Sequence, residues 1–151
     1  MPLRKGTPMP DLSGATEWIN GETKREDLIG SPTLIHFFAR SCHICHENMP
    51  AIIAWRDQFA SHGLKVVGIH MPREEQDTQM SAVRADISQM GVTEPCAIDN
   101  LHAIGERFEN QLWPAYFLFD AEGNMTGRAA GYAGLKMIEG PLKRLLNVDA
   151  A

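Results

Sequence analysis

The chain has 151 residues, of which 44% are hydrophobic, and this suits one compact domain spanning residues 1–151 around one core. Lysine and arginine total 14 and aspartate and glutamate total 19, so the net charge of −5 gives no electrostatic reason to expect binding to nucleic acid or to an anionic membrane surface. No run of about 18 apolar residues is present, so the sequence predicts no membrane-spanning helix.

The first thirty residues form a turn-rich segment of mixed polar and apolar composition. Arg4 and Lys5 are followed by Gly-Thr-Pro-Met-Pro-Asp, where a signal peptide would need an apolar stretch. We therefore expect a cytoplasmic protein, or an extracytoplasmic one if an export signal was removed. Asn20-Gly21, a pair favoured in tight turns, lies between residues 16–19 and 22–23 and predicts a small hairpin.

Apolar, β-branched runs alternate with helical periodicities along the rest of the chain. The pattern predicts strands at residues 32–38, 64–69, 96–98 and 115–119, and helices at residues 42–59, 74–90, 101–108 and 134–146. A turn at residues 120–123 would join the last of these strands to a further strand at residues 124–130. This order predicts an α/β fold with a central mixed sheet, parallel strands first and an antiparallel edge later, and helices on both faces.

Two of the three cysteines lie in the segment Cys42-His43-Ile44-Cys45. Three cysteines are too few for a secreted disulfide scaffold, so this spacing in an alternating strand–helix chain predicts a redox pair. Cys42 falls at the expected helix N-terminus, where free N–H groups and the helix dipole lower the pKa of a thiol. Cys45 lies one turn further on the same face and should be more shielded, so we assign attack on disulfides to Cys42 and resolution of the mixed disulfide to Cys45.

Histidines flank the cysteine pair. A protonated His43 would stabilise the Cys42 thiolate and make the disulfide more oxidising, and Glu47, four residues later, would pair with it. His46 could act in the same way. The alternative is that both histidines are exposed helix residues with ordinary behaviour.

Three segments together resemble the thioredoxin superfamily, and within it the TlpA/ResA-like thiol–disulfide oxidoreductases. Residues 37–50, which include Pro50, are similar to the strand, active site and helix of that family, residues 67–72 to its second strand and exit loop, and residues 112–123 to its cis-proline strand and turn. The resemblance covers nearly the whole chain. It implies a thioredoxin fold with an N-terminal extension, and a monomer that uses no cofactor, acts on disulfides in protein partners and receives electrons from a thiol donor.

The resemblance also implies roles for three residues. Pro114 would follow a cis peptide bond and pack against the disulfide of Cys42 and Cys45. Trp113 would line the substrate groove, with a partly buried core aromatic as the alternative. His36 stands where the family often has a buried acid or amide that relays a proton, and a hydrogen-bonded core histidine without a role is the alternative.

Three further positions bear on the site. Asn48 stands where ResA-like proteins often have glutamate, and Ser41 stands where tryptophan is common. These departures concern the redox potential and the substrate rather than the disulfide chemistry. Cys96 is expected in a strand as a buried small hydrophobe, and a third redox role stays open.

Other functions also stay open at this point. Cys42, Cys45 and His46 could hold Cu(I) or zinc in a metal carrier, if His36 or His43 moved to supply a further ligand. A thiol peroxidase is a second alternative, although the Pro-x-x-x-Thr-x-x-Cys segment of peroxiredoxins is missing here. The spacing Cys-x-x-Cys-His also matches covalent haem attachment, which would need an exported chain.

Overall fold

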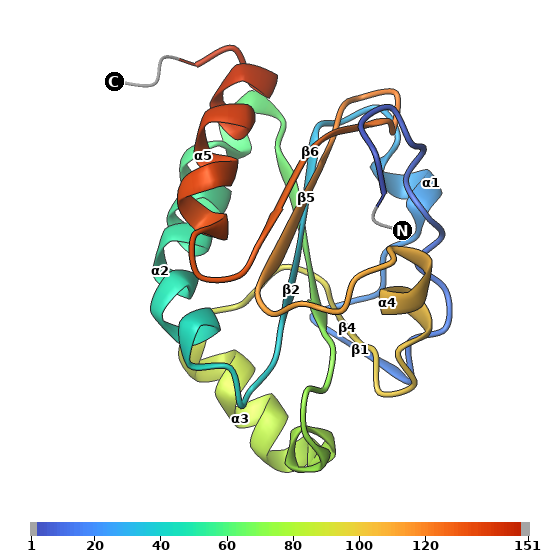
Figure 1. Cartoon of the computed structure of the whole chain (residues 1–151), viewed down its shortest axis with the longest axis vertical. Helices are drawn as coiled ribbons and strands as arrows, with labels where there is room; N and C mark the ends of the chain where they lie inside the picture. Colours follow the sequence, from blue (N-terminus) through green and yellow to red (C-terminus); the bar gives the residue numbers. More distant parts are fainter. Residues whose placement is uncertain (1–2, 149–151) are drawn as a thin grey trace.

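The computed structural model describes residues 3–148, and its centre is a six-stranded sheet (Figure 1). The strands are β1 (Glu17–Ile19), β2 (Thr33–Phe38), β3 (Lys65–His70), β4 (Cys96–Ile98), β5 (Ala115–Phe119) and β6 (Met125–Ala130). They lie in the order β1-β4-β3-β2-β5-β6. The pairs β2–β3 and β3–β4 are parallel, whereas the pairs that add β1, β5 and β6 are antiparallel. The predicted mixed sheet with a later antiparallel edge is confirmed.

Helices cover both faces of this sheet, as predicted. They are α1 (Arg25–Leu28), α2 (His43–Gln58), α3 (Met80–Met90), α4 (Ala103–Arg107) and α5 (Gly134–Leu145), with short 3₁₀ turns η1 (Ala60–His62) and η2 (Glu75–Thr78). In Figure 1, α2, α3 and α5 lie on one side of the sheet, and α1 and α4 lie on the other. Among residues 3–148, no helix is both long enough and apolar enough to cross a membrane.

Each face of the sheet has its own hydrophobic core, because side chains alternate along a strand. In β2, Leu34 and Phe38 belong to the core under α2, α3 and α5, whereas Ile35 and Phe37 belong to the core under α1 and α4. Every residue of β2 is buried, as expected for a central strand that is covered on both sides. The helix α2 therefore follows a central strand that is buried along its whole length.

The N-terminal hairpin predicted around Asn20-Gly21 is wrong. Both residues do turn the chain, with φ angles of 67° and 98°. However, β1 pairs antiparallel with β4 and not with residues 22–23. The Asn20 amide donates to the carbonyl oxygen of Glu94 at 3.0 Å, just before β4. The N-terminal segment therefore pairs with the edge strand β4. Pairing with β4 joins three residue pairs next to a buried strand, whereas residues 22–23 could supply only two.

The predicted helix at residues 74–90 is divided in two. It begins as η2, and the extended backbone of Gln79 (φ −77°, ψ 95°) separates this turn from α3. The buried carboxylate of Asp77 accepts hydrogen bonds from backbone N–H groups at the start of this segment, which favours a tight turn over a continuing helix. Gly91 ends α3 in the left-handed conformation (φ 79°), as predicted. The helix predicted at residues 101–108 is shorter, since α4 begins only after His102.

Candidate active site

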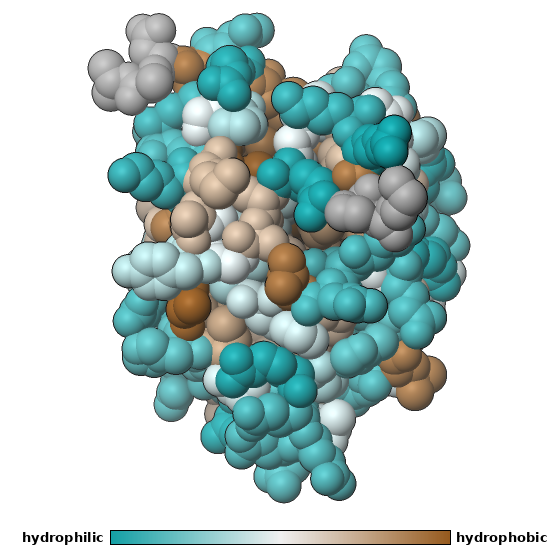
Figure 2. All heavy atoms as spheres, viewed as in Figure 1, coloured by the Kyte–Doolittle hydropathy of each residue, from teal (hydrophilic) through white to brown (hydrophobic). Residues whose placement is uncertain are grey.

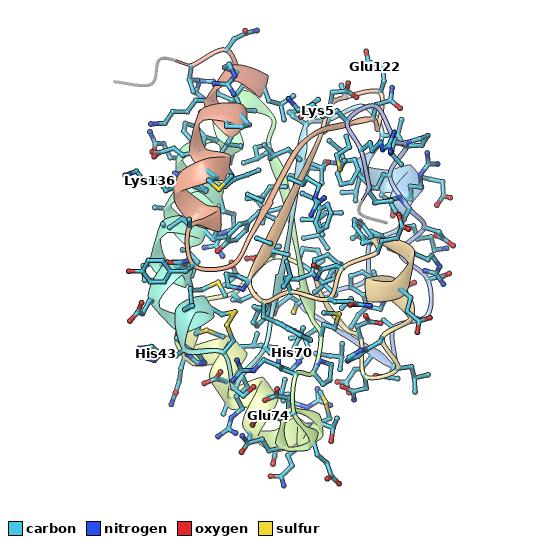
Figure 3. The ribbon with its side chains drawn as sticks, viewed as in Figure 1. Lys5, His43, His70, Glu74, Glu122 and Lys136 are labelled. Atoms are coloured by element: carbon cyan, nitrogen blue, oxygen red, sulfur yellow. A yellow bond between two sulfur atoms is a disulfide. The ribbon has the colours of Figure 1, made fainter. Side chains whose placement is uncertain are left out.

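Cys42 and Cys45 form a disulfide at the start of α2, and their Cα atoms are 5.3 Å apart (Figure 3). Cys42 is the residue that caps the helix, with an extended backbone (φ −89°, ψ 106°), and its Sγ accepts a hydrogen bond from the Cys45 N–H at 3.2 Å. The predicted position of Cys42 at a helix N-terminus is confirmed. Because free N–H groups and the helix dipole converge there, this setting favours a thiolate on Cys42.

The expected difference in shielding between the two cysteines is wrong for this disulfide form, since Cys42 and Cys45 are each 2% exposed. The S–S bond draws both sulfurs into the same core cluster. Their surroundings nevertheless differ. Cys45 lines a small pocket together with His36, Pro114 and Tyr116, and this pocket has no room for a water molecule.

The peptide bond between Trp113 and Pro114 is cis, as the resemblance implied. Pro114 lines the same small pocket as Cys45, and its carbonyl oxygen accepts a hydrogen bond from the Gly131 N–H at 2.9 Å. Trp113 is half-buried, and its indole N–H donates to the carbonyl oxygen of Met71 at 2.6 Å. This fixed indole fits the alternative of a partly buried core aromatic, and a role of Trp113 in the substrate groove stays a prediction.

His43 and Glu47 form the predicted pair, with Nε2 and Oε1 2.9 Å apart. Their side chains are 85% and 54% exposed, and His43 points away from the body of the molecule (Figure 3). Solvent screens such a pair strongly, so it contributes little to stability. His46 turns the other way: its Nε2 donates to the carbonyl oxygen of Arg40 at 2.7 Å and lies 3.2 Å from a carboxylate oxygen of Asp86.

His36 belongs to a buried ionic network that the sequence did not reveal. Its Nε2 is 2.6 Å from one carboxylate oxygen of Glu94, and the other oxygen accepts a hydrogen bond from Arg56 at 2.8 Å. Burial alone would raise the pKa of Glu94, but the interaction with His36 and the hydrogen bond from Arg56 outweigh it and lower this pKa to about 2. Glu94 is therefore ionised, and His36 Nε2 donates to it.

The position where ResA-like proteins often have glutamate is occupied by an amide that contacts a phenol. Asn48 donates to the hydroxyl oxygen of Tyr116 at 3.4 Å. Tyr116 lies directly opposite His36 in the pairing of β2 with β5, so both side chains share the face that carries Cys45. Burial raises the pKa of Tyr116 to about 12, which keeps the hydroxyl protonated near the disulfide. The sequence analysis did not identify Tyr116, whose only signal was its position two residues after Pro114.

Cys96 is a free, fully buried thiol in β4. Burial, with the nearby charge of Glu94 adding to it, raises the pKa of this thiol far above its usual range. A thiol that stays protonated and enclosed is a poor nucleophile. The prediction of a buried small hydrophobe is confirmed.

The ligand set that a metal carrier would need is not assembled. Among residues 3–148, no three side chains of His, Cys, Asp or Glu are grouped so that they could hold a metal ion. His36 is committed to Glu94, and His46 is committed to the carbonyl oxygen of Arg40. His36 and His46 therefore serve the protein's own hydrogen-bond networks.

A mixed sheet that presents a Cys-x-x-Cys disulfide at a helix N-terminus, beside a cis-proline, defines the class of thioredoxin-like redox proteins. The chain belongs to the AhpC/TSA family, whose model matches residues 5–128. It is 43% identical over 147 residues to the thiol-disulfide oxidoreductase YkuV of Bacillus subtilis, covering 97% of each chain. It is also 31% identical over 142 residues to the protein DipZ of Mycobacterium bovis. That alignment covers 91% of this chain but only 20% of the length of DipZ.

Solved structures agree with this assignment. A thioredoxin-like protein in its oxidized form, solved in solution, superposes with a TM-score of 0.86 at 41% identity and covers 95% of this chain and 97% of its own. A putative thiol:disulfide interchange protein DsbE from Chlorobium tepidum superposes with a TM-score of 0.82 over 95% of this chain and 99% of its own. At 22% identity, the second likeness supports the fold alone. The predicted thioredoxin fold and the resemblance to ResA-like proteins are confirmed.

Proposed function

We propose that this protein is a thiol–disulfide oxidoreductase that reduces or exchanges disulfides in protein partners through a mixed disulfide on Cys42. The observation that carries the proposal is the Cys42–Cys45 disulfide at the tip of α2, with the Cys45 N–H directed at the Cys42 sulfur. A relative that is 43% identical over nearly the full length of both chains is named for this activity.

The reaction starts from the dithiol form, because the disulfide form carries no nucleophile. The Cys42 thiolate attacks one sulfur of the partner disulfide, the partner S–S bond breaks, and its second sulfur leaves as a thiolate that takes a proton. The Cys45 thiolate then attacks the Cys42 sulfur of the mixed disulfide and releases the second partner thiol. Two electrons have moved to the partner, and Cys42 and Cys45 are left as a disulfide that a thiol donor must reduce.

Exposed apolar side chains near Pro114 favour a protein as the partner. Leu112, two residues before Pro114, is 52% exposed, and Tyr132 is 81% exposed. Tyr132 follows Gly131, whose N–H donates to the carbonyl oxygen of Pro114. In Figure 2 the apolar colours gather between α5 and β6, whereas the end of the molecule formed by η2 is hydrophilic. Apolar and aromatic side chains rimmed by polar ones are typical of surfaces that contact proteins.

Several finer points stay predictions. His36 would exchange a proton with Cys45, and the support for this is that both residues line the same small pocket. Because Nε2 of His36 is bonded to Glu94, the exchange would use Nδ1. In a reducing compartment the dithiol would be the resting form, so net reduction of partners would be favoured. The protein would act there as a monomer, without nucleic acid or membrane.

Substitution of single cysteines tests the proposal. The Cys45→Ser variant, reduced and mixed with insulin, should accumulate a covalent complex through Cys42, because nothing resolves the mixed disulfide. The Cys42→Ser variant should lose insulin reduction altogether. Turbidity follows the precipitating insulin chains, and mass spectrometry of the acid-quenched mixture identifies the linked cysteine.

Cys96→Ser is the matched control, since it removes a cysteine that is buried in β4 and should leave insulin reduction unchanged. Insulin reduction by Cys42→Ser at the rate of the unmodified protein would contradict the assignment of the nucleophile. Failure of the unmodified protein to reduce insulin or any other protein disulfide would contradict the proposed function.

A further inference from the structure

Three residues separate β2 from Cys42, and the last two of them, Arg40 and Ser41, are held by side chains from other elements. We refer to these two residues as linker 40–41. The Arg40 N–H donates to Nε2 of His70 at 3.1 Å, and the Arg40 carbonyl oxygen accepts from His46 at 2.7 Å. Burial lowers the pKa of His70 to about 4, so its ring is neutral and Nε2 can accept. Both backbone groups of Arg40 are therefore fixed.

Ser41 is held even more completely. Its backbone N–H donates to Oδ1 of Asp77 at 3.0 Å, and its hydroxyl donates to Oδ2 at 2.7 Å. Its carbonyl oxygen accepts from the guanidinium of Arg73 at 2.9 Å. No backbone polar group of Ser41 is left to water, although its side chain lies at the edge of the molecule.

Asp77 is the centre of this arrangement. Its side chain is fully buried, and Oδ2 also accepts from the backbone N–H groups of Arg73 and Glu74 at 2.9 and 3.0 Å. Burial would raise the pKa of Asp77, but the hydrogen bonds from Ser41 and from these backbone groups outweigh it and lower the pKa. An ionised carboxylate with four donors thus ties the segment that enters the active site to the segment that leaves β3.

We propose that Asp77 is a positioning residue for thiol–disulfide exchange: by fixing Ser41, it keeps the Cys42 sulfur within bonding reach of Cys45. This inference rests on the proposed function and adds a residue to it. Linker 40–41 is followed directly by Cys42, whose N–H donates to the Ala39 carbonyl oxygen at 3.0 Å. Movement of Ser41 would therefore move Cys42 relative to α2.

Positioning of this kind sets the effective concentration of one thiol for the other. The equilibrium constant for forming the Cys42–Cys45 disulfide from oxidised glutathione measures this concentration directly. A loosened linker disfavours the disulfide, so the couple becomes more oxidising. For a two-electron couple, a tenfold change in this constant corresponds to about 30 mV.

Asp77→Asn is the first test. Whichever way the new amide is oriented, its NH₂ group faces at least one of the N–H donors that the carboxylate now accepts. We expect the equilibrium constant with glutathione to fall about tenfold, since loss of preorganisation costs effective concentration. Ser41→Ala removes the hydroxyl, which donates to Asp77 and accepts from Nε of Arg73 at 3.2 Å, and it leaves the charge of Asp77 in place. The backbone bond from Ser41 to Asp77 remains, so a smaller fall of about threefold is expected.

Asp99→Asn is the matched control. Asp99 is also fully buried, and its two carboxylate oxygens accept from the backbone N–H groups of Ile104 and Gly105 at 2.9 and 2.8 Å. These bonds hold α4, on the opposite face of the sheet from α2. This variant should lose thermal stability and keep the glutathione equilibrium constant of the unmodified protein.

A shift confined to the two linker variants supports the proposal. An unchanged constant in a folded Asp77→Asn variant, or an equal shift in Asp99→Asn, overturns it. If Asp77→Asn does not fold, Ser41→Ala decides, and an unchanged constant in that variant overturns the proposal. The measurement needs no protein substrate, so a failure of the proposed function in the insulin assay would be seen separately.

Discussion

Three polar side chains from distant parts of the chain meet on the face of the sheet that carries Cys45: His36 in β2, Arg56 in α2 and Glu94 before β4. The side chain of Glu94 is only 3% exposed, and burial of a carboxylate charge costs free energy. The N–H partners of both carboxylate oxygens offset this cost. Sequence reasoning identified His36 by its distance from Cys42, but it had no means to find the other two, because a glutamate in a short loop and an arginine on a helix are ordinary surface patterns.

The Glu94 network predicts how stability depends on pH. The pKa of Glu94 falls from 4.5 to about 2 on folding, so its stabilisation is complete above pH 4.5 and is lost as the pH falls from 4.5 towards 2. This shift corresponds to about 3 kcal/mol at neutral pH. Glu94→Gln should lower the free energy of unfolding by about this amount at pH 7 and remove this part of the acid dependence. Urea unfolding at several pH values between 7 and 3 measures both effects.

Glu47→Gln is the control for this prediction, because Glu47 pairs with His43 at the surface and solvent screens that pair. It should leave the unfolding curves unchanged. If Glu94→Gln lost as much stability as the unmodified protein between pH 5 and pH 3, the buried carboxylate would not be the source of the acid dependence.

At the scale of the elements, β3 packs closely against the imidazole ring of His36 on the neighbouring strand β2. A Cβ atom at Gly68 would lie 3.1 Å from Nε2 and 3.3 Å from Cε1 of His36. Glycine at this position therefore makes the room in which His36 reaches Glu94. The sequence predicted β3 from its apolar run and had no reason to single out Gly68, because glycine inside a strand is locally unfavourable.

Gly68→Ala should therefore destabilise the protein, since the added methyl group displaces a buried ring that cannot yield freely. We expect a loss of about 1–3 kcal/mol in the free energy of unfolding. Gly140→Ala in α5 is the matched control, because its Cβ would meet only the flexible end of Arg144, at 3.2 Å. Alanine there should stabilise the protein by about 0.5–1 kcal/mol through helix propensity.

Urea unfolding of both variants at pH 7 measures the two effects. Equal stability of Gly68→Ala and the unmodified protein would show that the packing of β3 against His36 is looser than these distances indicate.

At the scale of the whole molecule, one sheet separates two cores that share every strand. Trp55 belongs to the core under α2, α3 and α5, and Trp18 packs against the core under α1 and α4. Because β2 contributes alternate side chains to both cores, neither can lose its packing without disturbing the other. The sequence predicted one domain on size and composition, and the shared sheet explains why the two cores should act as one.

Unfolding should therefore be a single cooperative transition. Two double variants, each with one remaining tryptophan, test this. Trp18→Phe with Trp113→Phe leaves Trp55, whose fluorescence reports on the core under α2, α3 and α5. Trp55→Phe with Trp113→Phe leaves Trp18, whose fluorescence reports on the core under α1 and α4. Within each variant, the urea midpoint from fluorescence should equal the midpoint from far-UV circular dichroism. Separate midpoints would mean that the two faces unfold independently and that the prediction of one domain is wrong.

The sequence alone determined the features that depend on neighbours along the chain. The strands and the main helices follow from hydrophobic periodicity, and the chemistry of Cys42 and Cys45 follows from a spacing of one helical turn at a helix start. Only the tertiary structure decided which strand pairs with β1, which carboxylate meets His36, and that Asp77 holds Ser41. The physical reason is distance in sequence. These partners lie 36 or more residues apart. The partner of a charged side chain in a loop is therefore known only once the packing of the sheet has brought the two residues together.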